Sequence, residues 1–430
     1  MLASIKALPE QVRQYLIVTG NYWVFTLTDG ALRMLVVLHF HQLGYSPLAI
    51  AMLFLFYEIF GVVTNLVGGY LGARIGLNRT MNLGLAMQVI ALSMLLVPSS
   101  MLTIAWVMAA QGLSGVAKDL NKMSAKSSIK LLVTSGQYGS GEQEKLYIWV
   151  ARLTGSKNAL KGAGFFLGGA LLSLFGFTGA IGSMAGILVL VWIFSMVKLK
   201  KDLGKAKSKP KFSEIFSKSR SINILSAARL FLFAARDVWF VVALPVYLAS
   251  QFGWDHYYVG GFLALWVIAY GWIQTLAPRI TGSRQRNIGS RQRNIGGLQN
   301  DHSKVPDGRS ALLWASLLTA IPAAIALFMS ASSSPQLVLI SGLLLFGGVF
   351  AVNSSLHSYL IVSYASDDGV SLDVGFYYMA NAMGRLLGTI LSGWVYQVAG
   401  LEACLWISSA FLAMTVVISV YLPTREAALE

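Results

Sequence analysis

The chain alternates between long apolar blocks and short polar breaks. Each block is about 20 residues long, the length that a helix needs to cross the hydrocarbon core of a bilayer. Reading the blocks along the 430 residues predicts twelve membrane-spanning helices. They lie near 15–40, 47–72, 80–97, 101–121, 155–176, 179–197, 222–250, 257–277, 310–330, 336–362, 374–399 and 402–422. The pattern therefore predicts an all-α integral membrane protein.

Composition agrees with this pattern. The chain is 56% hydrophobic and only 12% charged, and soluble chains carry about twice that charge. Its one cysteine, Cys404, excludes an internal disulfide and a cysteine-based metal cluster, and lies in an apolar run that predicts burial. The N-terminal residues lack the short apolar core and cleavage site of a signal peptide, so we expect the first span to be retained.

The basic residues indicate how the chain is oriented. Of the 33 Lys and Arg residues, 29 lie in the two tails or in and beside the loops that follow even-numbered spans. Positive residues concentrate on the cytoplasmic side of membrane proteins, so both termini are predicted to be cytoplasmic. The net charge of +15 is then mainly a topology signal, and it gives no reason to expect nucleic-acid binding.

Six spans, a long basic linker and six more spans make up the chain. The predicted division is an N-terminal bundle at 1–197, a basic cytoplasmic linker at 198–221 and a C-terminal bundle at 222–430. Carriers of the major facilitator superfamily have this plan, with two bundles that rock around a central site. An exact tandem repeat of GSRQRNI at 282–295 is expected to be a disordered loop insert.

The loop after the second span resembles the conserved loop motif of that superfamily. Gly69, Arg74, Gly76 and Arg79 stand at the motif's positions, whereas Ala73 replaces its aspartate. The resemblance implies the twelve-helix fold of the superfamily. The replacement leaves in doubt the charge latch that the aspartate forms in that family.

The seventh predicted span carries two arginines. Arg229 and Arg236 are seven residues apart, which places them on one helix face together with Phe233, while Asp237 follows directly. Buried charges need a partner or a function, and the planar guanidinium suits oxyanions because it donates two parallel hydrogen bonds. Both arginines are therefore candidate substrate ligands.

The first and eleventh spans add further candidates. Tyr22, Asp29 and Arg33 share a face of the first span, where Asp29 and Arg33 can pair one turn apart, either as a structural pair or as a switch that couples transport. Asn381 and Arg385 are one turn apart on the eleventh span. Tyr22, Arg33, Asn381 and Arg385 are assigned to the substrate site.

Two more titratable residues are candidates for proton coupling. Glu58 lies in the second span without a basic neighbour one turn away, and burial favours the neutral form of such a carboxyl. His357, in the tenth span, is expected to be either a hydrogen-bonded link between helices or a proton carrier. The predicted coupling set is Glu58, Asp29, Asp237 and His357.

Lysines recur every four residues at the end of the fourth span and at the start of the fifth, at Lys118, Lys122, Lys126, Lys130, Lys157 and Lys161. Such a stripe is typically solvated or faces lipid headgroups. Because the fourth span lines the central site in this fold, Lys118 and Lys122 are also assigned to the substrate site. No metal, cofactor or catalytic residue is predicted, and the chain is not expected to be an enzyme.

Five stretches closely resemble the ArsJ-type organoarsenical efflux permeases of the same superfamily. They are NYWVFTLTDGALRMLVVLHFHQLGYSP (21–47), LFYEIFGVVTNLVGGYLGAR (55–74), AKDLNKMSAKSSIKLL (117–132), LTGSKNALKG (153–162) and LSAARLFLFAARDVWFVVALPVYL (225–248). The resemblance covers nearly the whole chain except the repeat at 282–295. It implies a bacterial inner-membrane exporter of 1-arseno-3-phosphoglycerate, which confers arsenate resistance. It also implies a metabolic partner, the glyceraldehyde-3-phosphate dehydrogenase that makes this ester.

Three interpretations follow from the sequence. The first is the arsenical exporter, driven by proton exchange. The second is a carrier of the same fold for another organic phosphate, another anion or a drug, although a drug exporter would favour a more acidic site. The third is a membrane receptor or scaffold without transport, which leaves the arginines inside the spans unexplained.

Overall fold

The computed structural model describes residues 10–45, 53–134, 142–199, 219–254, 256–281, 306–366 and 370–424. In these ranges every regular element is helical. The helices are α2 (Glu10–Gln42), α4 (Leu55–Ile75), α5 (Leu77–Met94), η1 (Ser99–Met101), α6 (Ile104–Thr134), α7 (Glu142–Lys198), α8 (Arg220–Phe240), α9 (Ala243–Phe252), α10 (His256–Ile280), α11 (Gly308–Ala331), α12 (Pro335–Tyr364) and α13 (Val370–Ser419).

These helices form the twelve predicted membrane helices. The two longest, α7 and α13, are each broken into two by a glycine with positive φ, Gly176 at 65° and Gly400 at 76°, a conformation that glycine adopts without strain. Conversely, α8 and α9 together form one span. Among the described residues, seven helical segments, including both broken ones, are long and apolar enough to cross a membrane.

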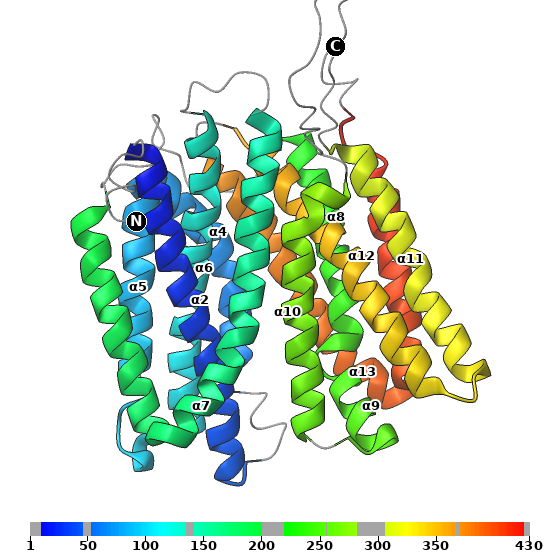
Figure 1. Ribbon diagram of the computed structural model, residues 1–430, viewed down its shortest axis with the longest axis horizontal. Coiled ribbons are helices and arrows are strands. Elements are labelled where there is room, and N and C mark those ends of the chain that lie inside the picture. The colour runs from blue at the N-terminus through cyan, green and yellow to red at the C-terminus, as the bar shows by residue number, and fades with distance from the viewer. Residues whose placement is uncertain are drawn as a thin grey trace, which may run out of the picture.

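The two halves of the chain lie side by side. Helices α2 and α4–α7 occupy one side of the molecule, and α8–α13 occupy the other (Figure 1). Within each half, glycines let helix backbones approach closely. A Cβ at Gly164 of α7 would collide with the carbonyl oxygen of Leu27 of α2, and a Cβ at Gly384 of α13 would collide with the carbonyl oxygen of Leu230 of α8. Most of the predicted linker, residues 200–218, and all of the repeat at 282–295 lie outside the described residues.

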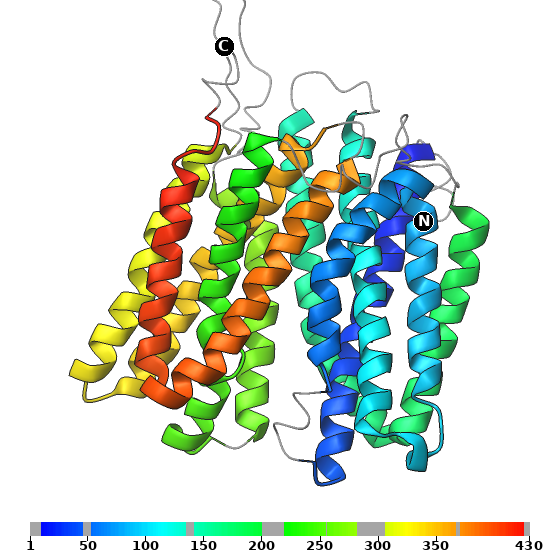
Figure 2. The same cartoon turned by 180° about the vertical axis from the view of Figure 1, so that it is seen from behind.

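Helix α2 begins, and α13 ends, on the same side of the molecule, here called the terminal face (Figure 1). Near this face the halves pack closely. Gly69 of α4 meets Ser371 and Gly375 of α13, and the Ser371 hydroxyl donates to the Gly69 carbonyl oxygen at 2.8 Å. Gly155 of α7 likewise packs on Gly271 of α10. Toward the opposite face α4 and α13 diverge (Figure 2), so the halves are closed at the terminal face.

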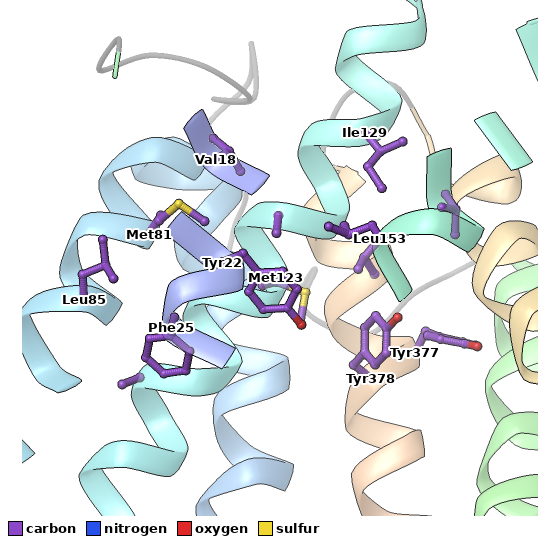
Figure 3. Packing of buried hydrophobic residues seen from close by; sticks show 14 of the residues in the cluster. Val18, Tyr22, Phe25, Met81, Leu85, Met123, Ile129, Leu153, Tyr377 and Tyr378 are labelled. Atoms are coloured by element: carbon purple, nitrogen blue, oxygen red, sulfur yellow. The ribbon is translucent and has the colours of Figure 1, made fainter. Parts of the chain in front are cut away.

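The outer surface is strongly apolar, as the membrane assignment requires. Large side chains such as Leu174, Trp272 and Trp394 are 65–74% exposed. Inside, a buried cluster joins residues of both halves, and Figure 3 shows Tyr22 and Met123 from the first half near Tyr378 from the second. Cys404 is fully buried, as predicted.

Candidate functional site: charged residues between the two halves

Two arginines and one carboxylate link the halves at the centre. Arg33 of α2 and Arg385 of α13 both bond Glu58 of α4, with Nη2–Oε1 distances of 3.1 and 2.9 Å. The contact between Glu58 and Arg385 joins residues 327 positions apart in the sequence. This pairing corrects the expectation of a neutral, isolated Glu58, because a carboxyl group between two guanidinium groups is best suited to carry its charge.

The same series of ion pairs continues along the second half. Arg385 Nε also bonds Asp237 Oδ2 at 3.3 Å, and Asp237 Oδ1 pairs with Arg236. Arg33, Glu58, Arg385, Asp237 and Arg236 thus alternate in sign, and we call them the arginine–carboxylate chain. Arg236 and Asp237 are consecutive residues of α8, and the long guanidinium side chain folds back onto its neighbour.

Arg229 is buried without a carboxylate. It is 3% exposed, its Nε donates to Asn381 Oδ1 at 2.9 Å, and its Nη1 donates to the carbonyl oxygen of Ser354 at 3.2 Å. The guanidinium groups of Arg229 and Arg236 lie 4.0 and 4.8 Å from the ring centre of Phe233. The predicted shared face of α8 is therefore confirmed. Among the described residues no acid pairs with Arg229.

The expected pair between Asp29 and Arg33 is wrong. Asp29 instead accepts from the Tyr57 hydroxyl, at 2.9 and 3.0 Å to its two oxygens. Arg33 lies over the ring of Tyr57, 4.4 Å from its centre, and extends to Glu58. Tyr57 thus separates the acid from the arginine, and sequence spacing gave no sign of its role.

Lys118 and Lys122 lie between the halves, as their assignment to the substrate site predicts. Lys118 Nζ is 3.8 Å from the ring centre of Tyr57, and Lys122 Nζ is 4.6 Å from that of Tyr378 in the opposite half. Both approach buried Asp119, Lys122 at 2.7 Å and Lys118 at 3.9 Å. Their positions are incompatible with a solvated or headgroup-facing stripe.

Three further lysines belong to this region but were not assigned to the site from sequence. Lys126 is only 2% exposed and its ammonium group donates to the Thr154 hydroxyl. Lys157 and Lys161 of α7 are partly buried and lie within electrostatic range of Asp29 and Arg385. The four-residue spacing was the available signal, but it fits a surface stripe equally well.

Tyr22 and His357 occupy buried positions near the site. Tyr22 is 2% exposed and lies within electrostatic range of Asp29, Asp119 and Tyr378. His357 is fully buried, and neither ring nitrogen has a hydrogen-bond partner among the described residues. The expected hydrogen-bonded link between helices is therefore not formed by His357.

The region as a whole carries excess positive charge. Among the described residues it contains nine basic side chains and four acidic ones, a formal excess of five basic groups. The basic residues are Arg33, Lys118, Lys122, Lys126, Lys157, Lys161, Arg229, Arg236 and Arg385, and the acidic residues are Asp29, Glu58, Asp119 and Asp237. Such an arrangement can attract and hold an anion between the halves.

Comparison with known proteins agrees with this architecture. A family model described as Major Facilitator Superfamily matches residues 18–298. No curated protein sequence matches the chain. Three solved structures illustrate the likeness in fold. The human organic anion transporter MFSD10 (TETRAN) is 17% identical, with a TM-score of 0.70, over 96% of this chain and 100% of that one.

The other two structures are bacterial. The E. coli fucose:proton symporter FucP is 11% identical, with a TM-score of 0.70, over 97% of this chain and 100% of that one. A bacterial homologue of the iron transporter ferroportin, in an outward-facing state, is 14% identical, with a TM-score of 0.68, over 95% and 99% of the two chains. At such identities the likeness establishes the fold alone.

Proposed function

The chain belongs to the major facilitator superfamily and is a multi-pass membrane transporter rather than an enzyme, and we propose that it exports a multiply charged organic anion. The observation that carries the proposal is the formal excess of five basic side chains over acidic ones between the two halves. Uncompensated charge inside a membrane protein is costly. A bound anion with two or more charges would offset that cost.

The resemblance to ArsJ-type permeases gives the proposed substrate, 1-arseno-3-phosphoglycerate. This ester carries oxyanionic groups, which guanidinium groups bind with two parallel hydrogen bonds and ammonium groups bind as point charges. Arg236, Arg229, Arg385 and Arg33 are the proposed ligands, assisted by Tyr22, Asn381, Lys118 and Lys122. One of the similar structures, MFSD10, is itself titled an organic anion transporter, which supports an anionic cargo but not this particular ester.

We propose that the terminal face is cytoplasmic and that the membrane is the bacterial inner membrane. The excess of basic residues in the loops on that side supports this orientation. The close packing of Gly69 on Gly375 and of Gly155 on Gly271 would then describe a carrier closed to the cytoplasm. Alternating access requires these contacts to separate when substrate is loaded from the cytoplasm.

Proton exchange is the proposed energy source, with Glu58 as the main coupling residue and Asp29, Asp237 and His357 as its partners. Glu58 bonds arginines of both halves. A proton taken up by this carboxylate would remove the negative charge between Arg33 and Arg385. The ion pair that joins the halves would then weaken, which is what a coupling step needs.

The decisive test is uptake into everted membrane vesicles that contain the carrier. Vesicles are supplied with glyceraldehyde 3-phosphate, NAD, the cognate dehydrogenase and arsenate, and accumulated arsenic is measured. We expect uptake that requires both arsenate and the dehydrogenase, and arsenate resistance in cells only when both proteins are expressed. Uptake that is independent of the dehydrogenase would contradict the assigned substrate.

A carrier for another organic phosphate is the second candidate, because the same basic residues would serve it. The vesicle assay separates the two, since a stable organic phosphate would accumulate without arsenate. A drug exporter is less well supported because the central charge is positive. A receptor or scaffold would show no flux with any of these substrates.

A further inference from the structure

Two rows of lysines lie opposite each other in the first half. Lys122 and Lys126 are one turn apart on α6, and Lys157 and Lys161 are one turn apart on α7. The rows are in register because Lys126 donates to the hydroxyl of Thr154, which lies one turn before Lys157. We call these four residues the lysine ladder.

The ladder has almost no negative charge of its own. The only carboxylate that pairs with it among the described residues is Asp119, and Lys122 shares this acid with Lys118. Lys126 is 2% exposed, and the charges that act on it, from Lys122, Lys157 and Arg229, are all positive. Asp29 is within electrostatic range of the two lysines on α7 but is bonded to Tyr57.

A structural explanation for this arrangement is weak. Burying an ammonium group without a carboxylate is costly, and a single hydrogen bond to a hydroxyl group offsets only part of that cost. A headgroup-facing stripe is also excluded, because Lys126 is enclosed by protein. An uncompensated cost of this kind is typical of a binding site whose ligand brings the missing charge.

The ladder faces the other half of the molecule. Lys122 lies over the ring of Tyr378 in α13, and Lys126 is within electrostatic range of Arg229 in α8. Beside Lys157, the Asn158 side chain donates to Gln274 Oε1 of α10 at 2.5 Å. The ladder therefore lies between the halves. Its Lys126 end is near the Gly155–Gly271 contact at the terminal face, and its Lys161 end is within electrostatic range of Arg33 in the arginine–carboxylate chain.

We propose that the lysine ladder, together with Arg229, is a second oxyanion subsite, separate from the arginine–carboxylate chain. The carrier would then hold a substrate that has two anionic groups on a short carbon body, one at each subsite. Because Lys126 bonds Thr154, which is next to the Gly155–Gly271 contact near the terminal face, this end of the subsite would be the first to meet substrate that enters when that face opens. The inference rests on the proposed anion transport, and it adds that the substrate must carry two charged groups.

The test compares two stable probes that share a three-carbon body, propyl phosphate and propane-1,3-diyl bisphosphate. Binding to the purified full-length carrier in lipid nanodiscs is measured by calorimetry. The variants are Lys126→Met and Lys157→Gln. The matched control is Arg152→Gln, which removes an exposed charge from the same helix, α7. Thermal unfolding of each variant reports whether it is folded.

The wild type and Arg152→Gln should bind the bisphosphate at least ~10-fold more tightly than the monophosphate, since a hydrogen bond to a charged group contributes roughly that factor or more. Each ladder variant should lose most of this preference and keep its affinity for propyl phosphate. Unchanged preference in folded ladder variants would overturn the second subsite alone. Failure of the wild type to bind either probe would instead count against the proposed anion transport.

Discussion

The arginine–carboxylate chain and the lysine ladder lie in the same interface but balance their charges in opposite ways. In the chain, Glu58 and Asp237 each contact two arginines, so every guanidinium group has a carboxylate. In the ladder, Lys126, Lys157 and Lys161 form no ion pair with a described residue. The chain can therefore hold the empty halves together, whereas the ladder has no carboxylates among the described residues to pair with these three lysines and is open to an anionic ligand.

This difference in charge balance also assigns different tasks to the two regions. A substrate anion that binds Arg385 or Arg236 must compete with Glu58 or Asp237, so binding there weakens the link between the halves. A substrate anion at the ladder competes with no acid except Asp119. We therefore expect changes in the chain to affect movement of the halves, and changes in the ladder to affect affinity.

The largest effect is expected for Arg236→Ala. The loss of charged hydrogen bonds to the substrate, each worth about 1.5–3 kcal/mol, should reduce vesicle uptake at least ~100-fold. Asp237 keeps its contact with Arg385, so the fold should persist. Uptake is measured per amount of carrier in the membrane, with Arg152→Ala as the control. Loss of carrier from the membrane would show that Arg236 is structural.

Glu58→Gln should abolish uphill transport and leave downhill flux. The amide keeps the size and hydrogen bonding of the side chain, but it supplies no charge between Arg33 and Arg385 and binds no proton at physiological pH. Accumulation against a gradient and counterflow between equal concentrations are measured on the same vesicles. A variant that still concentrates substrate in response to a proton gradient would refute the coupling role.

Thermal stability should change in opposite directions in the two regions. Lys126→Met removes an uncompensated buried charge, so it should raise the unfolding free energy by about 1 kcal/mol and Tm by about 2 °C. Arg385→Gln cuts the ion pair to Glu58 that joins the halves, so it should lower Tm. The two variants are compared in the same nanodiscs without ligand. A lower Tm for Lys126→Met would mean that the ladder stabilises the empty carrier.

The smallest effect is expected for Asp29→Asn. The amide oxygen still accepts from the Tyr57 hydroxyl, so Tm should stay within ~1 °C of the wild type. Loss of one negative charge near the basic residues should tighten anion binding by less than ~3-fold. The effect is small because the effective dielectric constant of a protein, about 20, weakens the repulsion between Asp29 and the anion. Calorimetry with propyl phosphate measures the change, and Asp29→Leu, which loses the hydrogen bond as well, is the comparison. This prediction assumes that the only effect of Asp29 on the anion is repulsion. Weaker anion binding by Asp29→Asn than by the wild type would contradict it.

The sequence predicted the fold well and the charge pairing poorly. The twelve spans and the shared face of Arg229 and Arg236 are confirmed. Both depend only on local sequence, the spans on the length of each apolar block and the shared face on the helical period. The expected pair of Asp29 with Arg33 and the isolation of Glu58 are wrong. Their actual partners come from other helices, where spacing along one helix carries no information.

By itself, the sequence determined which segments enter the membrane and which carry charge into it. Apolar blocks of about 20 residues must become helices in lipid, because only a helix satisfies its own backbone hydrogen bonds there. Tertiary structure alone decided which of those charges are neutralised. The bond from Arg385 to Glu58 spans 327 residues, and the burial of Lys126 depends on how α6 packs against α7 and the opposite half.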